Sequence, residues 1–131
     1  MRRALLLVAL AALVPTDAVA ARASVPVSAT IQAKAHPQVY CEECIRLSGR
    51  VSSPKPVCRA NRTLESATAY RAGSPAAGKV YRDPHFLDTD GQGKWSVVTG
   101  SGEPLAWFEV IVPRKRVGGV VCQAARAKVR L

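Results

Sequence analysis

The first 20 residues have the composition of a secretory signal peptide, and this feature sets the chemistry open to the rest of the chain. Met1-Arg2-Arg3 is a short positive start, residues 4–14 form an apolar run, and Ala18-Val19-Ala20 supplies the small residues that a signal peptidase requires. The apolar run is too short to span a bilayer. We therefore expect a secreted, extracellular chain that starts near Ala21 and has no membrane span after cleavage.

Length and composition then favour one small domain. Cleavage after Ala20 leaves 111 of the 131 residues, which is enough for one domain. Aromatic residues make up 5% of the chain, so the core has to rest mainly on Val, Ala, Leu and Ile. Small exported domains with a thin core commonly gain stability from disulfides.

The organisation along the chain predicts a folded region that begins near Cys41. Residues 21–40 mix Ala, Ser, Val and Pro without an evident period, and we expect a flexible or extended lead-in there. Residues 41–131 are expected to form the folded domain. Within it, strand-like segments with turn signals between them lie at 45–51, 64–71, 79–82, 95–99, 106–112 and 120–126, with the last running on to 131 as an alternative.

Two of these segments are informative in detail. In residues 45–51, apolar side chains such as Leu47 and Val51 alternate with Arg46 and Arg50, which is typical of a half-buried strand with its arginines in solvent. The segment 106–112 is apolar on both faces, so it is expected to be a central strand. The alanine-rich segment 64–71 also fits a helix. The pattern as a whole predicts an all-β fold, a disulfide-stabilised antiparallel β-sandwich of six to seven strands, with a small barrel as the alternative.

The four cysteines predict two disulfides, for which three connectivities exist. We favour Cys58–Cys122 together with Cys41–Cys44. α-Carbons three residues apart in a strand are about 10 Å apart, whereas a disulfide needs less than about 7 Å, so residues 41–44 would have to form a turn. A redox centre is disfavoured by the two glutamates between Cys41 and Cys44, and a zinc site by the isolated positions of Cys58 and Cys122.

The charge of the chain suggests anionic partners. The formal net charge of +10 becomes +9 in the mature chain, because Arg2, Arg3 and Asp17 are removed. Such a surface attracts anionic polymers, and the cluster Arg114, Lys115 and Arg116 is the candidate anion-binding site. An anionic surface polymer or an extracellular protein is the expected partner. Nucleic acid is not expected, because no basic arm or row of interleaved aromatics is present. The oligomeric state stays open.

The remaining motifs do not indicate catalysis. Residues 88–95 resemble the start of a calcium loop, but Thr99 stands where the bidentate glutamate belongs, so a glycine-rich turn that leads to Trp95 is favoured. Neither His36 nor His85 lies in a nucleophile or metal pattern, and no phosphate-binding glycine loop is present. Asn61-Arg62-Thr63 matches a glycosylation acceptor. We expect no enzyme activity, no catalytic residue, no metal site and no cofactor.

Several of these segments together resemble a known class of domain. They are Ser48-Gly49-Arg50-Val51 with the proline-containing loop and cysteine that follow it, the turn at 88–95, and the segment 118–122 before a basic C-terminal strand. Together these resemble small secreted bacterial domains of the transthyretin-like, carboxypeptidase-regulatory-like type over about Leu47 to Leu131. The resemblance implies a seven-stranded, immunoglobulin-like antiparallel sandwich. It also implies a non-enzymatic module for surface contact, adhesion or binding. The charge of the mature chain and the Arg114 cluster favour the alternative, a basic secreted effector that binds anionic envelope or matrix polymers.

Overall fold

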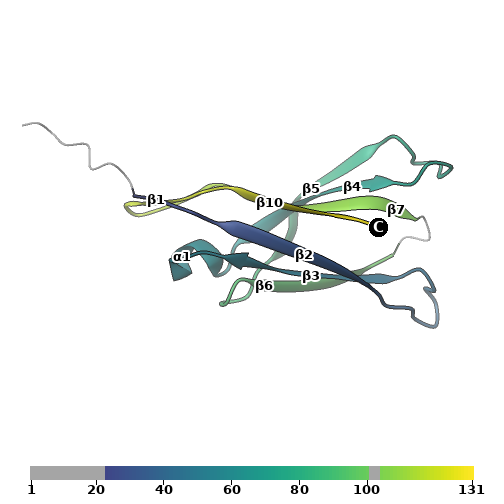
Figure 1. Cartoon of the computed structure of the whole chain (residues 1–131), viewed down its shortest axis with the longest axis horizontal. Coiled ribbons are helices and arrows are strands. Elements are labelled where there is room, and N and C mark those ends of the chain that lie inside the picture. Colours follow the sequence, from purple (N-terminus) through teal and green to yellow (C-terminus); the bar gives the residue numbers. More distant parts are fainter. Residues whose placement is uncertain (1–22, 101–103) are drawn as a thin grey trace, which may run out of the picture.

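The computed structural model describes residues 23–100 and 104–131, which form a mostly β structure with several sheets (Figure 1). In chain order the elements are β1 (Ala23–Val25), β2 (Ser28–Ala35), β3 (Ile45–Ser52), α1 (Pro56–Arg59), β4 (Thr63–Tyr70), β5 (Val80–Asp88), β6 (Lys94–Thr99), β7 (Leu105–Val112), β8 (Lys115–Val117), β9 (Val120–Cys122) and β10 (Ala125–Arg130). The expected signal peptide, residues 1–20, lies outside the described residues.

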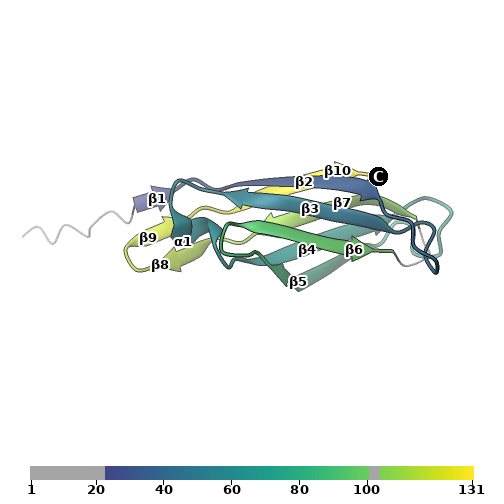
Figure 2. The ribbon, with the colours of Figure 1, turned by 90° about the horizontal axis from the view of Figure 1, so that it is seen from below.

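Two antiparallel sheets carry most of the structure. One has the strand order β10-β7-β4-β5 and the other the order β2-β3-β6, while a small third sheet has the order β1-β9-β8. Both larger sheets contribute to one buried core cluster, made by Leu47, Val51, Leu64, Trp95, Phe108, Val110 and Val112. Residues of both sheets thus pack into one core, in the elongated body that Figure 2 shows.

The two sheets close on one side only. Strands β2 and β10, each at the edge of its own sheet, lie side by side (Figure 2). At the opposite edges, β5 and β6 do not pair. Near the turn that joins them, Phe86 packs edge to face on Trp95 with ring centroids 6.0 Å apart, and away from that turn the two strands diverge (Figure 1). A hollow where they diverge is described below.

Alternation explains the central strands. Leu47 and Val51 of β3 are fully buried, whereas Arg46 and Arg50 are exposed, which confirms the prediction of a half-buried strand. Strand β7 lies between β10 and β4, which confirms its predicted central position. The alanine-rich segment forms strand β4 and not a helix. It pairs with β7 on one side and with β5 on the other.

The amino-terminal region differs from the expected lead-in, because residues 23–25 and 28–35 are strands. Strand β2 pairs with β3 along its whole length, from Ser28 opposite Ser52 to Ala35 opposite Ile45. Its apolar positions pack partly buried against the core, and they include Ala29, Ile31 and Ala33. Apolar side chains at alternate positions point to one side of a pleated strand. The segment expected to be a lead-in therefore forms a strand with its apolar side toward the core.

Two other segments differ from their predicted limits. Strand β5 runs to Asp88 and not only to residue 82, and it includes Pro84. Proline is tolerated there because β5 is an edge strand, where one row of backbone groups has no ladder partner. The final segment is split into β9 and β10, which belong to different sheets.

Both favoured disulfides are formed. The α-carbons of Cys41 and Cys44 are 5.3 Å apart. The N–H of Cys44 donates to the carbonyl oxygen of Cys41 at 3.4 Å, which closes the turn that the bridge requires. The second bridge, Cys58–Cys122, joins α1 to β9, and both of its cysteines are fully buried.

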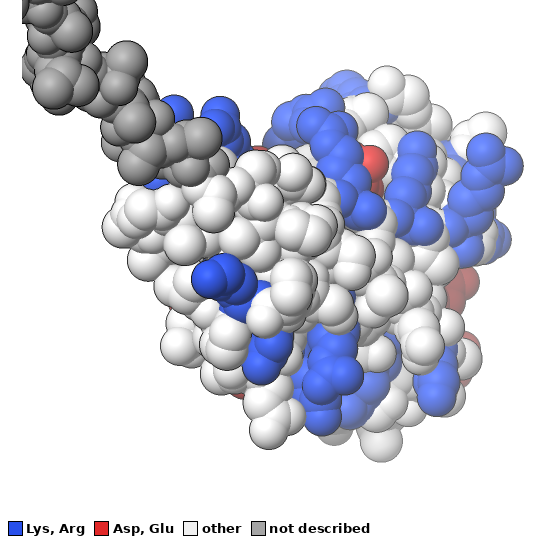
Figure 3. Space-filling view, turned by 60° about the vertical axis from the view of Figure 1, so that its left-hand side comes forward, with Lys and Arg blue, Asp and Glu red and all other residues white. Residues whose placement is uncertain are grey.

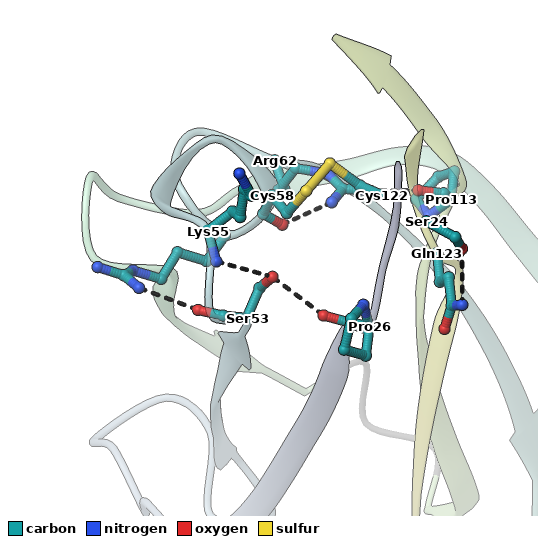
Figure 4. The surroundings of a disulfide bond; sticks show 10 residues. Ser24, Pro26, Ser53, Lys55, Cys58, Arg62, Pro113, Cys122 and Gln123 are labelled. Atoms are coloured by element: carbon teal, nitrogen blue, oxygen red, sulfur yellow. Dashed lines mark hydrogen bonds between the residues drawn. A yellow bond between two sulfur atoms is a disulfide. The ribbon is translucent and has the colours of Figure 1, made fainter. Parts of the chain in front are cut away.

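Arg62 supports the buried disulfide from the side (Figure 4). Its side chain is 2% exposed, and its guanidinium donates to the carbonyl oxygens of Cys58, at 2.6 Å, and Pro113. Burial lowers the pKa of the Arg62 guanidinium from its ordinary value. Because both of these hydrogen bonds go to backbone carbonyls, Arg62 ties the end of α1 to the segment after β7.

Candidate functional site

The predicted anion-binding cluster lies at the end of the molecule that carries α1 and β1. Arg114, Lys115 and Arg116 are all exposed, and the last two belong to β8, the edge strand of the small sheet. Lys115 lies opposite Cys122 and Arg116 opposite Val121, so two of the three cations are held in a strand ladder. Figure 3 turns this end forward and shows many Lys and Arg side chains with few Asp or Glu side chains.

A second cationic surface covers the outer side of the β2-β3-β6 sheet, and we call it the basic face. Its side chains follow from strand register, in three rows across the sheet: Thr30, Arg50 and Lys94; Gln32, Ser48 and Ser96; Lys34, Arg46 and Val98. Four of these nine residues are cations, and none is a carboxylate. The face is therefore uniformly basic or neutral from one edge of the sheet to the other.

The basic face is hollowed rather than flat. A depression of about 530 Å³ is lined by residues of the first two rows, including Ser48, Arg50 and Ser96. The serine side chains are short, so the middle row forms the floor of this depression. Arg50 also lines a second depression of about 500 Å³, which continues to Ser53 and to Arg59 of α1. One guanidinium thus stands between two adjoining hollows.

The turn before β6 holds the only carboxylate that lines either hollow within the described residues. The Asp90 Oδ1 atom accepts the backbone N–H groups of Gln92, at 2.8 Å, and of Lys94, at 2.9 Å. These bonds lower the pKa of the Asp90 carboxyl from its ordinary value of 3.8, the bond from Lys94 more than that from Gln92. Asp90 is thus engaged by its own turn, which confirms the predicted glycine-rich turn leading to the buried Trp95.

Asp90→Asn is expected to destabilise the fold at neutral pH but not in acid. A carboxyl whose pKa is depressed by folding stabilises the fold above its unfolded-state pKa, and this contribution is lost as the pH falls through the folded-state pKa. Asparagine keeps an oxygen acceptor but has no charge. The difference in Tm between Asp90→Asn and the parent protein should therefore close as the pH is lowered through 3.8 and below. If the difference in Tm stays the same in acid, the substitution destabilises the turn through its geometry and not through the lost charge.

The opposite outer face, on the β10-β7-β4-β5 sheet, carries charges of both signs. The guanidinium of Arg126 lies 3.8 Å from a carboxylate oxygen of Glu109. The Lys128 ammonium lies 4.0 Å from the ring centroid of Trp107, in a cation–π contact. Unlike the nine residues of the basic face, this face therefore includes a carboxylate that pairs with one of its cations.

Other chemistries find little support in the described parts of the chain. Among residues 23–100 and 104–131, no group of three or more His, Cys, Asp or Glu side chains is placed to hold a metal ion. The Asp88 carboxylate accepts the Thr63 hydroxyl at 2.8 Å, and the Asp83 carboxylate accepts the backbone N–H of His85 at 2.9 Å. No helix in these ranges has the length and apolar character that crossing a membrane demands.

Comparison with known proteins gives no family assignment. The chain matches no protein-family model, and no curated protein or solved structure is significantly similar to it. The function therefore has to be argued from the surfaces themselves.

The sequence contained a signal for the basic face that composition alone did not reveal. Thr30, Gln32 and Lys34 alternate with small apolar residues, as Arg46 and Arg50 do in the next strand. Two neighbouring strands with polar side chains at alternate positions present them on one face if they pair in register. The sequence does not give this register, and the structure was needed to show that the polar side chains of β2 and β3 share one face.

Proposed function

We propose that this chain is an exported, non-enzymatic module that acts by surface contact and binds anionic polymers through the basic face. In this proposal the two larger sheets form a β-sandwich of the transthyretin-like type. The observation that carries it is the absence of any carboxylate among the nine outward residues of the face, four of which are cations.

Like charges lie directly opposite one another on this face. Lys34 is the cross-strand partner of Arg46, and Arg50 is the partner of Lys94. Directly opposed like charges destabilise a sheet. This repulsion occurs twice on the face. A bound polyanion would offset it by placing negative charge between the two cations of each pair. The arrangement is accounted for by anion binding and has no evident structural use.

The other side chains of the face suit the same ligand. Hydroxyls and an amide stand between the cations, from Ser48, Ser96, Thr30 and Gln32. They supply donors to the oxygen atoms of a phosphate, sulfate or carboxylate group, while the arginine forks bind such groups in a bidentate manner. A broad sheet face with adjoining hollows fits an extended chain better than a compact small molecule. The proposed ligand class is therefore a linear polyanion.

The proposal predicts that heparin affinity depends more on where positive charges are removed than on how many are removed. Arg50→Gln/Lys94→Gln and Lys115→Gln/Arg116→Gln each remove two exposed positive charges. We expect the first variant to elute from a heparin column at clearly lower salt, and its dependence of log affinity on log salt to flatten by about two. The second variant should stay close to the parent protein.

Two other outcomes would contradict this assignment. Equal losses in both variants would mean that heparin responds to net charge alone. A larger loss in Lys115→Gln/Arg116→Gln would place the site on the Arg114 cluster. The urea midpoint of each variant is measured beside that of the parent protein. This control establishes that both variants are folded when their heparin retention is compared.

A further inference from the structure

A separate hollow lies at one edge between the two larger sheets. It measures about 220 Å³, and it is lined by Ser66, Thr68, Tyr70, Tyr81, Arg82, Asp83, Thr99, Leu105 and Phe108. We call it the tyrosine cleft. It lies where β5 and β6 diverge, so it opens to solvent beside the core (Figure 1).

The inner side of β4 departs from the apolar pattern at this cleft. Leu64 is fully buried in the core, but the next two positions on the same side of the strand are Ser66 and Thr68. They lie opposite Val110 and Phe108, which are core residues. Both residues line the hollow, and neither hydroxyl is a buried atom without a hydrogen-bond partner. The two hydroxyls are therefore open to solvent, and so to a polar ligand.

Aromatic rings stand beside these hydroxyls. The ring centroids of Tyr70 and Tyr81 are 5.5 Å apart with an angle of 85° between the planes, so the pair is edge to face. Tyr81 is 48% exposed and lies directly opposite Thr68. An edge-to-face pair holds each ring in place. One side of the cleft thus offers a fixed, solvent-exposed aromatic surface beside a hydroxyl.

The charges at the cleft differ from those of the basic face. Asp83 lies opposite Ser66, and its Oδ1 atom accepts the backbone N–H of His85 at 2.9 Å. Arg82 follows the same strand and balances the charge of Asp83. An ionised carboxylate is a strong acceptor for ligand hydroxyls. The cleft therefore combines an aromatic surface, hydroxyls and a carboxylate with no net charge.

We propose that the tyrosine cleft binds one neutral pyranose ring of a glycan. The C–H face of the ring stacks on the tyrosines, and the ring hydroxyls bond to Ser66, Thr68 and Asp83. The hollow of about 220 Å³ is too small for an oligosaccharide and suits a single ring at the end of a chain. This site lies on other residues than the basic face, so it does not depend on polyanion binding.

Titration with methyl glycosides tests the proposal directly. The probes are the methyl pyranosides of glucose, galactose, mannose and N-acetylglucosamine, added to the ¹⁵N-labelled mature protein. We expect at least one to shift the amide signals of residues 66–70 and 80–83 with a Kd on the order of 1 mM, as suits a single exposed ring. If none of the four shifts these signals at saturating concentration, the proposal is wrong.

Matched variants show whether the shifts come from the cleft. Tyr81→Ala should weaken the binding at least about tenfold, and the isosteric Thr68→Val about fivefold. The controls are Tyr40→Ala, which removes a tyrosine that is 100% exposed elsewhere, and Val80→Ala, at the neighbouring position that is 50% exposed. Both controls should bind as the parent does. Binding that Tyr81→Ala and Thr68→Val leave unchanged would overturn the proposal.

A heparin experiment separates the two sites. Tyr81→Ala should keep the heparin retention of the parent protein, and Arg50→Gln/Lys94→Gln should keep its glycoside shifts. Each proposal can then fail in its own measurement while the other is still supported.

Discussion

Replacing both Cys58 and Cys122 by alanine is expected to lower the free energy of unfolding by about 4 kcal/mol. The two residues are 64 positions apart in sequence, so the bridge removes much of the entropy of a long loop from the unfolded chain. A small domain has a total stability of about 5–15 kcal/mol, so this variant should be unfolded in part or melt at much lower temperature. Urea denaturation of the oxidised parent and of the variant measures the difference.

The other disulfide supplies the control. Cys41 and Cys44 are 3 positions apart, and on the same loop-entropy model their bridge contributes only about 2 kcal/mol. The Cys41→Ala/Cys44→Ala variant should therefore stay folded. If its loss equals or exceeds that of Cys58→Ala/Cys122→Ala, the stability does not come from closing the long loop.

Gly49→Ala is expected to destabilise the fold by about 3 kcal/mol or more. A Cβ atom at Gly49 would lie 2.0 Å from the backbone oxygen of Thr30 and 2.8 Å from the indole ring of Trp95. Strand β3 lies between β2 and β6, so neither neighbour can withdraw without opening a ladder. The substitution should lower the urea midpoint sharply and change the fluorescence of Trp95 in the folded state.

Gly91→Ala is the matched control for this prediction. A Cβ atom at Gly91 would meet nothing within 4 Å, so the expected change in stability is below about 0.5 kcal/mol. Replacing glycine by alanine lowers the entropy of the unfolded chain, which by itself stabilises the fold. If Gly49→Ala destabilises the fold no more than Gly91→Ala does, the close approach of three strands at Gly49 has no energetic role.

Much of the fold was predictable because local patterns decide it. The alternation of Leu47 and Val51 with Arg46 and Arg50 identifies β3, and residues apolar on both faces identify β7 as central. For these two strands the deciding information lies within a few residues. The favoured cysteine pairing, one of three that four cysteines allow, is confirmed together with the turn that a Cys41–Cys44 bridge requires.

The parts that were missed depend on distant partners. The segment 28–35 alternates, but it is rich in alanine, a weak strand former, and only β3 gives it a ladder to join. Pro84 argues against a strand unless the strand is known to lie at an edge. The basic face and the tyrosine cleft needed the register of three or more strands, which no local pattern supplies. Of the candidate site residues, Arg114, Lys115 and Arg116 could be singled out from the sequence because they are contiguous, and their role in anion binding stays a prediction.

The pairing of β1 with β9 has a consequence for the order in which the protein can mature. Ala23–Val25 lies parallel to Val120–Cys122, and Cys122 is also the partner of Cys58. A chain that crosses a membrane with its amino end first cannot make either connection until almost all of it has passed. For the exported chain proposed above, the Cys58–Cys122 disulfide is therefore a late step of folding, which follows the passage of nearly the whole chain.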